Sequence, residues 1–223
     1  MEELLKDLKI RINEDLFLKD PESSKLGKKI LGEGILLISE IGFEEFTFKK
    51  LGKRIGSNES SVYRYFKNKH IFLVYIINWF WGWKEFQLTF ATHGIQDPLE
   101  KLLKAIEVMA HPVEEDIRFA HVNEVALNNI VINEASKSYL TKEVDQENQF
   151  GYFLIYKRLI SRISKMIDDV DPEYAHPYSL SSTIADGALH LHFLNKHFST
   201  ITDAKGKCDP SHFLKNMVTN LLK

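Results

Sequence analysis

Residues 42–73 read GFEEFTFKKLGKRIGSNESSVYRYFKNKHIFL, which contains the signals of two short helices joined by a tight turn. Thr47 is a favourable N-cap for the first helix, and Asn58 is a favourable N-cap for the second, which we expect over residues 59–66. Between them lies Gly56, a residue that adopts turn conformations without steric cost. The pattern predicts a helix-turn-helix unit, whose second helix has about the width of the DNA major groove.

A supporting helix is expected before this unit. Over residues 25–41, apolar residues recur at intervals of three and four, and Gly42 is suited to end the helix. Residues 1–22 form an N-terminal extension with a net charge of −3, which makes it a poor arm for the minor groove of DNA. Its alternation of leucine and charge predicts a short amphipathic helix over residues 1–19 that packs on the protein itself.

The charge of the chain is unevenly distributed. The 223 residues carry a net charge of −2, which excludes a protein that coats nucleic acid with a basic surface throughout. Between Thr47 and Lys69, however, seven basic residues and one acid give a net charge of +6. Residues 23–70 together carry +5, and the remaining 175 residues carry −7. A basic module on an acidic body favours a protein that binds DNA at one place, because phosphate neutralisation needs such a patch.

The rest of the chain also has the periodicity of helices, so the predicted fold class is all-α. Further helices are expected over 70–89 and through 117–127. One more begins at Asp97-Pro98 and another ends near Ile167. The last two begin at Asp171-Pro172 and at Asp209-Pro210. The most apolar run, 71–83, is too short for a membrane span of about 20 residues. The single cysteine excludes an intramolecular disulfide, and the N-terminus lacks a signal-peptide pattern, so we expect a cytoplasmic protein.

The stretch 42–73 resembles the DNA-binding domain of the TetR family of bacterial transcriptional regulators. The resemblance is most specific in the Tyr-x-Tyr-Phe-x-x-Lys block that begins at Tyr63, and it departs from the family pattern at Gly52, where the family favours alanine. It implies an N-terminal three-helix domain over residues 23–70, followed by an all-helical effector-binding and dimerisation domain over 71–223. The residues it implies for DNA contact are Thr47, Lys49, Lys50, Asn58, Ser60, Ser61, Tyr63, Arg64, Tyr65 and Lys69.

Some of these positions have two interpretations. Arg64 could read guanine or clamp a phosphate, and Tyr65 could place its hydroxyl on the DNA backbone or be a core aromatic residue. Glu59 could accept a hydrogen bond from cytosine, although stabilisation of the helix dipole is the simpler role. Val62 and Phe66 are better interpreted as core residues that hold the recognition helix.

The resemblance further implies a ligand-responsive repressor that binds a palindromic operator as a homodimer and is released by a small apolar or aromatic effector. We expect the dimer to form through residues 173–198 and 210–222, since a two-fold pair can read two half-sites about 34–36 Å apart. Large aromatic residues could line the effector pocket or could simply be core. The candidate pocket residues are Trp79, Trp83, Phe86, Phe119, His121, Tyr152 and Tyr156.

An enzyme is not expected, because the chain has no Gly-rich phosphate loop, no HExxH motif and no Ser-His-Asp order. No metal or other cofactor is expected either, because His190 and His197 are seven residues apart on one helix and His192 points elsewhere. The remaining alternative is a helical ligand-binding or interaction protein that does not use DNA.

Overall fold

The computed structural model describes residues 10–114, 119–203 and 209–222, and within them the fold is all-α. These residues form ten α-helices and four short 3₁₀ helices, and they contain no strand. They divide into two compact units, Met1–Gly82 with Val113–Ile155, and Trp83–Pro112 with Tyr156–Lys223. None of the helices in the described ranges is both long and apolar enough to span a membrane.

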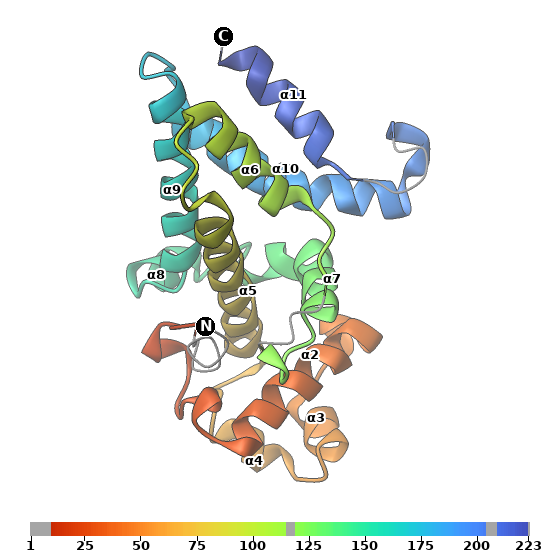
Figure 1. The fold of residues 1–223 in the computed structure, drawn as a ribbon. Helices are drawn as coiled ribbons and strands as arrows, with labels where there is room; N and C mark the ends of the chain where they lie inside the picture. The colour runs from red at the N-terminus through yellow and green to blue at the C-terminus, as the bar shows by residue number, and fades with distance from the viewer. Residues whose placement is uncertain (1–9, 115–118, 204–208, 223) are drawn as a thin grey trace. The chain divides into compact units, whose positions relative to one another are not determined.

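The first unit is built on the helix α2, Lys25–Glu45. Ser24 caps α2 by accepting a hydrogen bond from the Gly27 amide, at 3.1 Å. Regular helix geometry breaks where expected, at Gly42, whose φ of 76° is open to glycine but strained for other residues. One short turn follows the break before the chain enters α3, Phe48–Arg54. In Figure 1, α3 and α4 (Glu59–Tyr63) lie beside α2.

An aromatic cluster forms the core beneath these helices. Phe72, on the long helix α5 (Lys69–Thr92), stacks on Phe46 at 5.4 Å between ring centroids and meets Phe66 edge-on at 5.0 Å. All three side chains are fully buried. Gly34 of α2 lies directly over the Phe72 ring, where a Cβ atom would clash. The aromatic cluster therefore fixes the distance between α2 and the start of α5.

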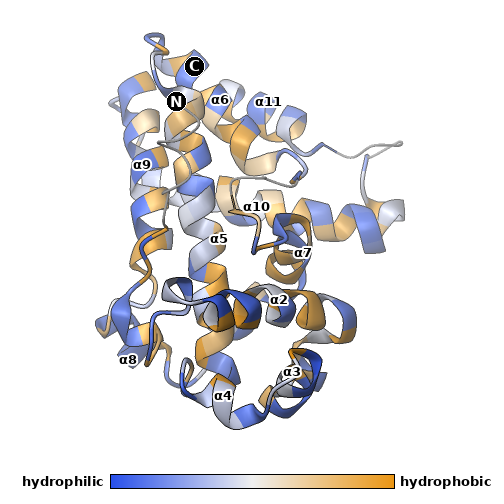
Figure 2. Cartoon of the chain, turned by 60° about the horizontal axis from the view of Figure 1, so that its bottom comes forward, coloured by the Kyte–Doolittle hydropathy of each residue, from blue (hydrophilic) through white to orange (hydrophobic). Residues whose placement is uncertain are grey.

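The other helices of the first unit follow later in the chain. They are α7 (Glu124–Glu134), which packs on α2, and α8 (Val144–Gln149), with the 3₁₀ helix η4 (Ala135–Ser138) between them. A helix was expected through 117–127, but residues 119–123 are not α-helical and α7 begins after Asn123, whose side chain accepts from the Ala126 amide at 2.7 Å. Residues 117 and 118 of that prediction lie outside the described residues. Figure 2 shows α7 as mainly hydrophobic and α3 as mainly hydrophilic.

The predicted helix over residues 1–19 was wrong where it can be examined. Residues 1–9 lie outside the described part of the chain, and from Ile10 onward only two 3₁₀ turns precede α2, η1 (Glu14–Leu16) and η2 (Pro21–Ser23). The segment is held by tertiary contacts instead: Leu16 is fully buried, and the Leu18 amide donates to the carbonyl oxygen of Tyr65 at 2.8 Å. We call residues 10–20 the N-terminal strap. It packs on the protein itself, as expected.

The second unit contains the C-terminal part of α5 and four further helices. These are α6 (Pro98–Ala110), α9 (Leu154–Val170), α10 (Pro177–His197) and α11 (Ser211–Leu221), and a short η5 (Ser199–Ile201) follows α10. In this unit α6 packs against both α10 and α11 (Figure 1). Asp97 caps α6 as predicted, by accepting from the Glu100 amide at 2.7 Å. Asp171-Pro172 was wrong as the start of α10: Asp171 accepts the Tyr174 amide in a turn, and the helix begins at Pro177.

Candidate nucleic-acid interface

The two helices of the predicted helix-turn-helix begin at the predicted caps. Thr47 Oγ1 accepts a hydrogen bond from the Lys50 amide at 3.2 Å, and Asn58 Oδ1 accepts one from the Ser61 amide at 3.1 Å. The second helix, α4, ends at Tyr63 and is therefore shorter than the expected 59–66. Both caps satisfy amides that the helix itself cannot satisfy, so the start of each helix is fixed locally by sequence.

The turn between α3 and α4 brings their backbones into close contact. Gly56 has a φ of 70°, and the Ser57 amide donates to the carbonyl oxygen of Gly52 at 2.8 Å. A Cβ atom on Gly52 would lie 2.7 Å from the carbonyl carbon of Asn58 and 2.8 Å from the Glu59 nitrogen. The departure from the family preference for alanine at this position therefore has a steric reason, which the sequence did not reveal.

A buried face holds the recognition helix α4 against the unit. Val62, Phe66 and Leu51 are fully buried, as predicted for core residues. On the opposite face, Tyr63 is 48% exposed while its ring packs edge-on against Phe48 at 5.0 Å. The helix thus presents its N-terminal and outer residues to solvent, which is the orientation that major-groove reading requires.

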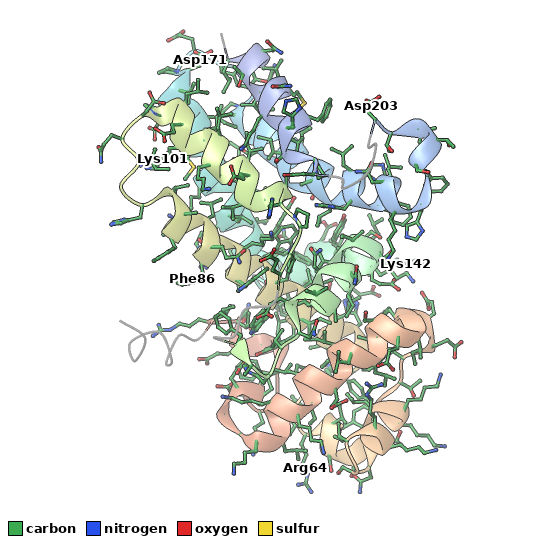
Figure 3. The ribbon with its side chains drawn as sticks, turned by 45° about the vertical axis from the view of Figure 1, so that its right-hand side comes forward. Arg64, Phe86, Lys101, Lys142, Asp171 and Asp203 are labelled. Atoms are coloured by element: carbon green, nitrogen blue, oxygen red, sulfur yellow. The ribbon has the colours of Figure 1, made fainter. Side chains whose placement is uncertain are left out.

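Exposed cations surround this outer face. Figure 3 shows the Arg64 side chain pointing outward from the end of α4. Lys49 and Lys53 of α3 are exposed as well, and so is Lys67 after α4. Within the described residues these four side chains form none of the salt bridges of the unit. They are therefore available to phosphate or base edges.

Other basic residues between Thr47 and Lys69 form ion pairs and hydrogen bonds within the protein. Arg54 donates to Glu33 at 2.7 Å and to Glu40 at 2.7 Å, and these carboxylates raise the pKa of its guanidinium, with the Glu40 hydrogen bond as the largest cause. Lys50 Nζ donates to the carbonyl and carboxylate oxygens of Glu45 at 2.7 and 2.9 Å. The charge count therefore overstates the positive charge that faces solvent.

Two predicted DNA-contact residues also lie in internal contacts. Tyr65 is 2% exposed, and its hydroxyl forms a 2.8 Å hydrogen bond with Ser24 Oγ, so the structure places it in the core. Lys69 Nζ donates to the carbonyl oxygens of Phe43 and Glu44 at 3.2 and 3.0 Å and lies over the Phe43 ring. Both residues join the recognition helix region to the ends of α2.

Small polar side chains at the start of α4 form a network of their own. Asn58 Oδ1 accepts from Ser60 Oγ at 2.7 Å and from Ser61 Oγ at 3.1 Å, in addition to its capping bond. Ser61 Oγ also accepts from Ser57 Oγ at 2.8 Å. Asn58 is therefore committed to the helix start, whereas the exposed Ser60 hydroxyl can turn toward an outside partner.

Sequence comparison identifies this part of the chain. Residues 30–75 match the family model described as bacterial regulatory proteins, tetR family. This part of the chain is a TetR-family domain. Its helix-turn-helix is a TetR-type DNA-binding domain, and the chain is a transcriptional regulator rather than an enzyme, in keeping with the family. No curated sequence matches the chain.

Solved structures of the same fold extend the likeness over 86–92% of this chain. The complex of AibR with isovaleryl coenzyme A and operator DNA is 18% identical, with a TM-score of 0.58 over 86% of this chain and 96% of that one. The fatty acid degradation regulator FadR from Bacillus halodurans is 14% identical, with a TM-score of 0.60 over 87% and 93%. The superantigen PfiT is 16% identical, with a TM-score of 0.57 over 92% and 96%. At these identities the likeness shows the fold.

The candidate effector residues divide between the two units. Trp79 and Phe119 meet edge-on at 5.2 Å in the first unit and are almost fully buried. In the same unit His121 is paired with Glu22 at 2.9 Å and lines an open groove beside α2, while Tyr152 lines another groove.

The second unit contains the other three candidate effector residues. Trp83 is 1% exposed, and Phe86 is half-buried beside Phe90, at 6.4 Å between ring centroids. Tyr156 donates its hydroxyl to Asp186 at 2.8 Å. The assignment of all seven residues to one effector pocket remains a prediction.

A carboxylate that no sequence motif pointed to holds the end of α2. Glu134 Oε1, at the C-terminus of α7, accepts the Phe43 amide at 3.2 Å, directly after the break at Gly42. Its other oxygen pairs with Lys137, which also pairs with Glu44. Only the i, i+3 spacing of Glu134 and Lys137 could have been noticed in the sequence. Across the described ranges, no three His, Cys, Asp or Glu side chains are placed to hold a metal ion.

Proposed function

We propose that the protein is a ligand-responsive repressor that binds a palindromic operator as a homodimer. The observation that carries the proposal is the solvent-facing recognition helix: both caps are formed, the inner face is buried, and Arg64, Lys49 and Lys53 lie exposed around it. Thr47, Ser60, Ser61 and Tyr63 complete the proposed contact surface. Such a surface supplies cations for phosphates and a side chain that can read guanine.

The homodimer is proposed to form through residues 173–198 and 210–222. Large apolar side chains are exposed along this part of the second unit: Tyr178 is 60%, Phe213 58% and Leu221 47% exposed. Apolar side chains exposed together on neighbouring helices mark interaction surfaces. An isologous contact would pair the same helices of two copies.

The effector is proposed to be a small apolar or aromatic compound. AibR was solved with isovaleryl coenzyme A and operator DNA, which makes a branched acyl chain the first apolar group to test. Release would follow if the compound binds more tightly to a conformation that fits DNA poorly. As a transcriptional regulator, the protein is proposed to act in the cytoplasm.

Titration of labelled DNA from upstream of the gene tests the proposal, with the salt concentration varied and the mass of the complex measured. We expect affinity for one segment to exceed that for scrambled DNA by at least 1000-fold and to fall steeply with salt. Arg64→Ala should weaken binding by about 10- to 100-fold, whereas Lys165→Ala, on an exposed position of α9, should leave it unchanged. Equal, salt-insensitive binding to all sequences would refute a repressor function.

A second candidate function follows from one comparison. The superantigen PfiT shares the fold, so the fold alone is compatible with a function outside transcription. The corresponding proposal here is a helical ligand-binding or interaction protein that does not use DNA. It would be favoured if the protein binds a ligand but no upstream segment.

A further inference from the structure

An open groove of about 500 Å³ lies in the first unit. One wall is the N-terminal strap with Phe17, another is the start of α5 with His70, and a third is α8 and its flanks with Glu147 and Tyr152. A volume of this size is in the range of small-molecule sites. Among its lining residues, Lys67 is also one of the exposed cations near α4.

The Glu147 carboxylate is the unusual feature of the groove. The residue is 8% exposed, and its Oε1 forms a 2.7 Å hydrogen bond with His70 Nε2. Its Oε2 is buried and has no hydrogen-bond partner among the described residues. The hydroxyl of Thr141, which lines the same groove, is likewise buried and without a partner among those residues. Buried polar atoms are normally hydrogen-bonded, so these two oxygens can each accept a hydrogen bond from an occupant of the groove.

The other residues that line the groove restrict the kind of ligand that can supply these hydrogen bonds. Asp15 and Glu143 add two carboxylates, against the single lysine Lys67, and thus favour a positively charged occupant. Phe150 and Tyr152 offer aromatic rings 6.0 Å apart, and Phe150 is 51% exposed. Aromatic faces attract cations and cover apolar groups. The lining therefore suits an ammonium group attached to an apolar body.

We propose that this groove binds a primary organic ammonium ion. Its N–H groups donate to Glu147 Oε2 and to the Thr141 hydroxyl, and its apolar part packs on Phe150 and Tyr152. An ammonium group has three donors and no acceptor, which matches an ionised carboxylate oxygen and a hydroxyl that lack donors. The proposal does not rest on operator binding, although the groove shares Lys67 with the exposed cations near α4 and Tyr152 with the candidate effector residues.

Calorimetry of the full chain with 2-phenylethylammonium chloride at pH 7 tests the proposal without DNA. We expect saturable binding with one site per chain. Glu147→Gln should weaken it by at least 10-fold, because the amide keeps the contact with His70 but removes the charge and places an N–H where the acceptor was. Asp145→Asn is the matched control: this acid is exposed on the same helix outside the groove, and its variant should bind as the wild type does.

Two probes keep the test decisive if the Glu147 variant does not fold. The trimethylated analogue of the probe has the same charge and ring but no N–H, so it should bind at least 10-fold more weakly than the primary amine. Phenylpropionate, which has an anionic group, should not bind. The proposal is overturned if the primary amine fails to bind, if both amines bind equally, or if folded Glu147→Gln retains wild-type affinity.

Discussion

Gly52→Ala would place a methyl group at the closest contact between α3 and α4. The new Cβ lies 2.7 Å from the Asn58 carbonyl carbon, 2.8 Å from the Glu59 nitrogen and 3.0 Å from the Asn58 oxygen. All three atoms belong to the backbone, so no side chain can rotate away. Non-bonded atoms prefer about 3.5–4.0 Å, so the start of the recognition helix must move by roughly 1 Å.

Two opposing effects set the change in stability. Replacing glycine by alanine in a helix interior stabilises by about 1 kcal/mol. Overpacking at a tight contact costs about 1–3 kcal/mol. Since the backbone gives little here, we expect Gly52→Ala to destabilise by up to about 2 kcal/mol, and displacement of α4 should weaken operator binding.

Gly187→Ala is the matched control. Its Cβ would meet only Leu214 Cδ2, at an ordinary 3.9 Å, so helix propensity should stabilise this variant by about 0.5–1 kcal/mol. Both variants are unfolded with urea at one protein concentration, because α10 belongs to the proposed dimer surface. If Gly52→Ala stabilises as much as Gly187→Ala and binds the operator as the wild type does, the steric argument is wrong.

Two further predictions concern buried groups. Burial lowers the pKa of Lys84 to about 8, while an unfolded lysine titrates near 10.5, so the unfolded state binds more protons between these values. Stability should therefore rise by about 3 kcal/mol from pH 8 to 10.5 through this group, and urea titrations of Lys84→Met should lack that rise. Tyr65→Phe should lose about 1 kcal/mol of stability with the Ser24 hydrogen bond but keep operator affinity in a binding titration. A tenfold loss of affinity would instead assign the Tyr65 hydroxyl to DNA.

The helix starts could be predicted because caps are local. Thr47, Asn58 and Asp97 each accept an amide within three residues, and that spacing is visible in the sequence. The same local reasoning placed α10 too early, because the Asp171 side chain accepts the Glu173 amide at 3.1 Å in a turn, much as it would at the start of a helix.

The N-terminal strap shows why periodicity alone was insufficient. Leucines at helical spacing form a helix with one buried face only if a single surface of the protein runs along that face. Here Leu16 is buried in the core. Ile10 lies against Gly82, so closely that a Cβ atom on Gly82 would clash with the Ile10 side chain. The backbone amide of Leu18 donates a hydrogen bond to the carbonyl oxygen of Tyr65, which is far away in the sequence. Separate docking points stabilise a non-helical segment, and none of them is encoded in the segment itself.

The positive charge that indicated DNA binding also depends on contacts with residues far away in the sequence. A net charge of +6 is a property of the sequence, but the charge presented to DNA depends on distant partners such as Glu33 and Glu40, which engage Arg54. Lys50 and Lys69 are likewise held within the protein.

Four exposed cations per chain remain around the two DNA-facing helices, so a dimer neutralises about eight phosphates. The logarithm of affinity should then fall against the logarithm of salt with a slope of about −7. A much steeper slope would mean that Arg54 leaves its carboxylates when DNA binds. DNA would then compete with the ion pairs that join α3 to α2.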